Sequence, residues 1–149
     1  MTIGSQTETS PTFATVPVAV TADQIANQMT TFIESGLSRF WCSGCYLETP
    51  GSYVLDAPGS RIWYANAGLY AADDWMIRVM EDENETGDPE DGKAHLISKK
   101  EFTAGLIALA TAENGAYAHH FNDIIKDEGD AATADILMQF VLFGKEVYA

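Results

Sequence analysis

Residues 136–143, with the sequence ILMQFVLF, contain one polar residue in eight. The segment lies between Asp130, a residue type that favours the N-cap position, and Gly144, which suits the left-handed position after a helix. A helix that is apolar on nearly all sides must be covered on all sides, either by its own chain or by a second subunit. The sequence therefore predicts a last helix that is the centre of the core or the seam of a homodimer. The candidate interface residues of that homodimer are Phe140, Phe143, Val147 and Tyr148.

Three earlier helices are expected from helical spacing of apolar residues and from capping signals. Their expected ranges are 22–35, 99–112 and 115–127. Thr21 with Gln24 and Ser98 with Glu101 have the spacing of capping boxes, in which each side chain bonds the other residue's backbone amide. Asn114 is the expected N-cap of the third helix.

The middle of the chain contains short aromatic and β-branched runs between turn-forming residues, a pattern typical of antiparallel strands. In one of them Trp75, Ile77 and Val79 alternate with Met76, Arg78 and Met80, so one face is expected in the core and the other half solvated. The expected strands lie within 38–49, 61–64, 73–82 and 93–99, and 12–20 is expected to be extended. These patterns predict an α+β fold in which an antiparallel sheet of three to five strands packs against about four helices.

A chain of 149 residues fits one domain. Residues 1–11, rich in Ser and Thr, are expected to form a mobile N-terminal arm, and residues 12–149 a single domain. The sequence contains no apolar run of membrane-spanning length and no signal-peptide pattern, which predicts a cytoplasmic location in a host cell.

The balance of charge excludes several classes of partner. Against 8 Lys and Arg stand 22 Asp and Glu, a net charge of −14. Repulsion should keep such a chain off nucleic acid and anionic membranes, whereas a basic host protein would attract it, including a nucleic-acid-binding defence effector. The alternative is that the acidity serves only solubility. The candidate partner-binding surface comprises Asp73, Asp74, Glu81, Asp82, Glu83, Glu85, Asp88, Glu90 and Asp91.

The pattern Trp-Cys-x-x-Cys ending at Cys45 resembles the redox site of thioredoxins, which requires a strand before the first cysteine and a helix that begins at it. Here a helix is expected before Cys42, and Pro50 prevents one from continuing after it. Cys42 and Cys45 also supply half of a tetrahedral zinc site, but the remaining ligands would have to come from isolated histidines. They stay weak metal candidates, and no cofactor is predicted.

The remaining histidines could serve as a base. His119 with Asp123, or His120 with Asp123, has the spacing of an oriented pair on a helix surface. Such pairs are usually structural, and no nucleophile, phosphate-binding loop or zinc-protease motif accompanies them. No catalytic residue is assigned, and the chain is not expected to be an enzyme.

The last twenty residues resemble the end of a family of small uncharacterised phage and prophage proteins. These proteins end in an Asp-Ala-x-x-Ala-Asp helix followed by Phe-Gly-x-x-Val-Tyr. The matching residues are Asp130, Ala131, Ala134, Asp135, Gln139, Phe143, Gly144, Val147 and Tyr148. The chain departs from the family in having Lys145, where Glu is usual. The resemblance implies an accessory protein of a mobile genetic element. Such proteins often inhibit bacterial defence systems of the CRISPR or restriction type, and the alternatives are a structural or accessory phage role or a domain that binds a small ligand or metal.

Overall fold

The computed structural model describes residues 18–55, 61–82 and 92–149. In these ranges the α-helices are α1 (Ala22–Ser35), α2 (Ala67–Ala71), α3 (Lys99–Ala110), α4 (Ala118–Ile125) and α5 (Ala131–Phe143). The strands are β1 (Cys42–Thr49), β2 (Met76–Glu81) and β3 (Lys93–Ile97), and the 3-10 turns are η1 (Leu37–Phe40), η2 (Trp63–Ala65) and η3 (Glu113–Gly115). The predicted α+β class, with a small antiparallel sheet against several helices, is confirmed.

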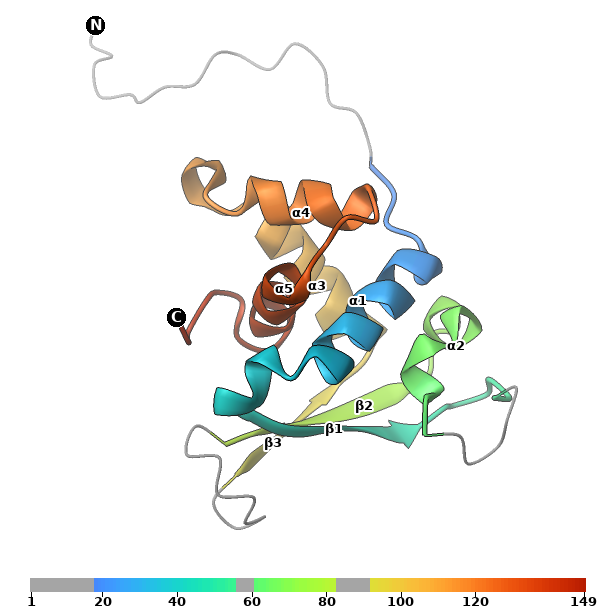
Figure 1. Cartoon of the computed structure of the whole chain (residues 1–149). Coiled ribbons are helices and arrows are strands. Elements are labelled where there is room, and N and C mark those ends of the chain that lie inside the picture. The colour runs from blue at the N-terminus through green and yellow to red at the C-terminus, as the bar shows by residue number, and fades with distance from the viewer. Residues whose placement is uncertain (1–17, 56–60, 83–91) are drawn as a thin grey trace, which may run out of the picture.

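The three strands form one antiparallel sheet in the order β1-β2-β3. Ile77 lies between Leu47 and Ile97 across the sheet, and these residues point toward the helices. The helices all lie on one side of the sheet, and α4 is the farthest from it (Figure 1). As predicted from the alternation, Ile77 and Val79 of β2 are buried, and so is Trp75, which precedes the strand.

The centre of the helical layer is α5, in which every residue from Thr133 to Val141 is buried. It packs between α1 and α3. The close approach of α3 depends on Gly105, because a Cβ atom there would lie 2.6 Å from the Val141 Cα. The nearly all-apolar helix is thus covered by its own chain. Among the four residues predicted for a dimer interface, Phe140 is buried and Val147 is 47 % exposed, and the dimer itself stays a prediction.

Local capping signals give the helix ends that the sequence predicts. Both capping boxes form, at Thr21 and at Ser98. The Asp130 side chain accepts a hydrogen bond from the backbone amide of Thr133, and Gly144 adopts a left-handed conformation with φ of 74°.

One expected element is wrong, and another is shorter than expected. Residues 61–64 were expected to form a strand, but Trp63 and Tyr64 are both buried in a 3-10 turn, a placement of neighbouring side chains that a strand does not allow. The helix expected over 115–127 begins at Ala118, because Asn114 lies in η3 with φ of 59° and interrupts the helical path. Residues 18–20 form no strand, and 12–17 lie outside the described residues.

Candidate functional site

The described carboxylates among those predicted to form a partner-binding surface lie at the two ends of β2. Asp73 and Asp74 precede the strand and are exposed. Asp73 pairs with the Lys99 ammonium at 3.0 Å. The Asp74 carboxylate accepts hydrogen bonds from the Ser52 amide at 2.8 Å and hydroxyl at 3.1 Å. Both carboxylates thus have bonding roles within the fold.

At the other end of β2, Glu81 and Asp82 point inward. Glu81 accepts a hydrogen bond from the Tyr148 hydroxyl and lies 2.8 Å from Nε2 of His95. Burial acts to raise the pKa of Glu81, but the bonds from Tyr148 and His95, with the charges of His95 and Lys93, outweigh it and lower that pKa. Asp82 is 2 % exposed, so its carboxylate is not presented to solvent.

The other five candidate carboxylates lie outside the described residues. They are Glu83, Glu85, Asp88, Glu90 and Asp91. All belong to residues 83–91, here called the acidic segment, which contains no Lys or Arg. It connects β2 to β3, whose residues Glu81 and Lys93 are paired. The acidic segment therefore carries five negative charges that no base within it can neutralise.

The positive charges are all in the parts of the chain that the structure describes, and they neutralise few carboxylates there. Two Lys or Arg side chains form ion pairs with carboxylates of described residues, Arg78 with Glu48 at 3.1 Å and Lys99 with Asp73 at 3.0 Å. Both pairs are well exposed, so solvent screens them. Most carboxylates of the described residues thus form no ion pair with a described Lys or Arg side chain.

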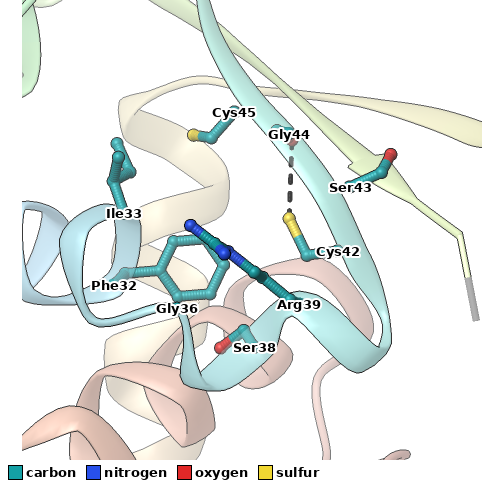
Figure 2. Close-up of a pocket in the computed structure, with 9 residues that line it drawn as sticks. All are labelled: Phe32, Ile33, Gly36, Ser38, Arg39, Cys42, Ser43, Gly44 and Cys45. Atoms are coloured by element: carbon teal, nitrogen blue, oxygen red, sulfur yellow. Dashed lines mark hydrogen bonds between the residues drawn. The ribbon is translucent and has the colours of Figure 1, made fainter. Parts of the chain in front are cut away.

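The two cysteines line a small cleft of about 190 Å³ between α1, η1 and β1 (Figure 2). In a regular strand Cys42 and Cys45 would point to opposite faces, but a register shift between Cys42 and Gly44 adds a residue and turns both thiols toward the helices. Burial raises the pKa of Cys42 to about 11, and burial also raises the pKa of Cys45. The thiols are therefore protonated at neutral pH, unlike reactive cysteines.

Among the described residues the two cysteines have no third metal ligand beside them, and His120 has a structural contact. Within the described ranges, no group of three His, Cys, Asp or Glu side chains is placed to hold a metal ion. His120 lies with Nδ1 2.8 Å from the Thr133 hydroxyl. Burial, reinforced by the charge of His119, lowers the pKa of His120 despite three nearby carboxylates. His120 thus bridges α4 and α5 as a neutral side chain.

A feature that sequence reasoning missed is the exposed outer face of the sheet, opposite the helices. Tyr46 and Leu96, 48 % and 55 % exposed, flank Arg78 across the three strands. The Arg78 guanidinium lies 5.1 Å from the centre of the Tyr46 ring. None of the described helices covers this face (Figure 1). The alternation of Met76, Arg78 and Met80 indicated such a face, but not that it would be left uncovered.

A second missed feature is a polar cluster within the apolar helix α5. The buried Asp135 carboxylate accepts hydrogen bonds from the Ser38 hydroxyl at 2.5 Å, Trp41 Nε1 at 2.7 Å and Gln139 Nε2 at 2.9 Å. Asp135 and Gln139 are four residues apart, so they lie on one face of the helix. The cluster ties α5 to η1 and to the start of β1.

Comparison with known protein families, with curated proteins and with solved structures finds no match. None of the described helices is long and apolar enough to cross a membrane. Fold and site together define a small acidic α+β protein with helices on one face of a three-stranded sheet.

Proposed function

We propose that the protein is a non-enzymatic, phage-encoded binding protein that inhibits a bacterial defence system, of the CRISPR-effector or restriction type, through acidic residues. The partner is a basic host protein whose nucleic-acid-binding surface the carboxylates occupy. The observation that carries the proposal is the density of negative charge in the acidic segment, which has five carboxylates and no Lys or Arg in nine residues. Carboxylates of this density satisfy Lys and Arg side chains that are arranged to bind phosphates, and they speed association.

The contacts of the described carboxylates limit which of the candidate residues are suited to binding a partner. Glu81 and Asp82 are turned inward, and Asp74 holds a turn. Their substitution would change the fold as well as the surface charge. The contacts with a basic partner are therefore assigned to the acidic segment.

Plaque formation on bacteria that each carry one restriction or CRISPR system tests this function. Expression of the protein should raise plaquing of a restricted phage on at least one strain. The triple variant Glu83→Gln, Glu85→Gln, Glu90→Gln should lose roughly tenfold or more of that effect, because each lost charge pair weakens an electrostatic interface. Binding to the purified effector should also weaken steeply between about 50 and 300 mM salt.

A matched control removes three charges elsewhere. Asp23, Glu113 and Glu128 are exposed and lie in other parts of the chain. Their Asn or Gln variants should inhibit as well as the parent does. Equal loss in both triple variants would show that net charge alone matters, and equal retention in both would remove the acidic segment from the mechanism.

A second candidate is a structural or accessory phage role with the partner seated on the outer sheet face. Exposed Tyr, Met and Arg side chains are enriched in protein interfaces, which favours this candidate. Leu96→Glu would then abolish partner binding and the acidic-segment variant would leave it unchanged, the reverse of the result expected for the inhibitor.

A further inference from the structure

The chain ends in a short segment, residues 145–149, that folds back over the body after α5. We call it the C-terminal strap. Its main chain is recognised by the side-chain amide of Gln139, which is fully buried. Gln139 Oε1 accepts hydrogen bonds from the amides of Val147 at 2.8 Å and Tyr148 at 2.7 Å. Gln139 Nε2 donates to the Tyr148 carbonyl at 3.0 Å. One side chain thus binds two neighbouring backbone amides and a carbonyl of the strap, whatever the side chain at position 147.

The site selects the side chain at position 148. The Tyr148 ring stacks on Trp41 with centroids 5.5 Å apart and planes 4° apart, and it also contacts Phe40 and Phe143. At the far end of the ring, the hydroxyl donates to the Glu81 carboxylate. A flat aromatic ring with a donor at its tip satisfies both contacts, so the site fits tyrosine.

The residues that bind the strap are held in place by contacts of their own. Trp41 Nε1 donates to Asp135, and the Trp41 carbonyl accepts from the Asp82 amide at 2.7 Å. Asp135 also orients the Gln139 amide. Glu81 lies 2.8 Å from Nε2 of His95 on the neighbouring strand. The binding surface is thus preorganised by the body of the fold, which reduces the entropy lost on binding.

The strap is joined to α5 through an exposed glycine. It leaves α5 at Gly144, whose φ of 74° is natural to glycine and whose surroundings within 4 Å are open. Lys145, Val147 and Ala149 are exposed. Glu146 of the strap accepts a hydrogen bond from the Tyr117 hydroxyl at 2.7 Å.

We propose that this surface binds the tyrosine-bearing strap of a second copy of the chain, in exchange for the chain's own strap. Exchange between copies reproduces every contact because the two straps are identical. Rotation about one glycine is enough to redirect the strap. The proposal concerns a surface distinct from the acidic segment and does not depend on the proposed function.

The full-length variant Tyr148→Ala tests the site, because its own strap no longer fills the space against Trp41. The probe is a fluorescent peptide with the sequence Lys-Glu-Val-Tyr-Ala. It should bind this variant saturably, and bind the parent at least about tenfold more weakly because the attached strap competes at high effective concentration. A peptide with Phe in place of Tyr should bind about tenfold more weakly, because it loses a hydrogen bond to a charged group. A peptide with Ala there should not bind.

A folded Tyr148→Ala variant that shows no saturable binding up to about 1 mM peptide overturns the proposal. If this variant does not fold, Val147→Pro serves instead, since it removes one amide donor to Gln139 and keeps the ring. If neither folds without the strap, the surface is not preformed and the proposal is wrong.

Exchange between copies is tested by shortening the connection. Deletion of Lys145 and Glu146 prevents Tyr148 from reaching its own site. At high concentration the deleted chain should have about twice the monomer mass of 16.2 kDa, and added peptide should return it to monomer. A monomeric deletion variant, together with peptide binding by Tyr148→Ala, would overturn the second copy as the source of the segment.

Discussion

Asp135→Asn should destabilise the protein far more than its small change in shape suggests. In the parent, Oδ1 of Asp135 accepts from Ser38 and Trp41, and Oδ2 accepts from Gln139. The asparagine oxygen can keep the first two donors, but its NH₂ group then faces the NH₂ group of Gln139. Rotation of the Gln139 amide would relieve this conflict only by breaking its two bonds to the Val147 and Tyr148 amides.

The magnitude follows from these contacts. A bond to a charged acceptor contributes about 1.5–3 kcal/mol, and a buried donor left without an acceptor costs about 1–3 kcal/mol. We expect the free energy of unfolding to fall by roughly 3 kcal/mol, a large part of the roughly 5–15 kcal/mol typical of a folded protein. Urea denaturation, followed by tryptophan fluorescence and circular dichroism, measures it.

The control is the same chemical change at Asp73, whose side chain is 89 % exposed and whose pair with Lys99 solvent screens. Asp73→Asn should change the free energy of unfolding by less than about 1 kcal/mol. In a chain that ends at Gly144, the Gln139 amide is free to rotate, so Asp135→Asn should cost about 1–2 kcal/mol less there. A loss below about 0.5 kcal/mol in the full chain, with an unchanged denaturant slope, would refute the account of the cluster.

Three further predictions concern pH, thiols and packing. Burial lowers the pKa of His120, so the parent should lose stability as pH falls below about 6.5, where the unfolded chain takes up the proton first. Urea midpoints measured between pH 8 and 4 should show that His120→Asn lacks this loss of stability. The variant should still lose stability below about pH 4.5, because the pKa values of Glu101 and Asp130 are lowered in the folded protein. Equal pH profiles for the parent and the variant would contradict the role of His120. Native Cys42, with a pKa of about 11, should react with a disulfide reagent at pH 8 about 100-fold more slowly than a free thiol, and a rapid native reaction would show that it is accessible as thiolate. Gly105→Ala should lower the free energy of unfolding by about 1–3 kcal/mol despite its better helix propensity, and a thermal melt at or above the parent's would contradict the close contact with Val141.

Features set by neighbouring residues could be predicted from the sequence. The capping boxes at Thr21 and Ser98 join residues three apart, so their partners are visible in the sequence. The burial of Ile77 and Val79 follows from strand alternation in the same way. The central position of α5 was one of the two alternatives that its lack of a polar face indicated, beside the seam of a homodimer.

Features that depend on residues far apart in the sequence could not be predicted from it. The stack of Trp41 on Tyr148 brings together two residues that are far apart in the sequence. The sequence neighbours of each residue give no indication of the other. The register shift after Cys42 changes which face Cys45 occupies, and only the pairing with β2 reveals it. Glu81 belongs to a run of carboxylates in the sequence, yet strand parity and His95 turn it inward.

Glu81 joins the strap site to the acidic segment. Its carboxylate receives the Tyr148 hydroxyl, and the next residue, Asp82, donates its amide to the Trp41 carbonyl. The residues that bind the strap therefore also hold the point from which the acidic segment leaves β2. A partner that binds the acidic segment and displaces one of these contacts therefore changes the occupancy of the strap site. By linkage, occupancy of the strap site changes the affinity for the partner by the same factor. Tyr148→Ala should therefore change the affinity for a basic partner although it removes no charge, and an unchanged affinity would show that the two surfaces act independently.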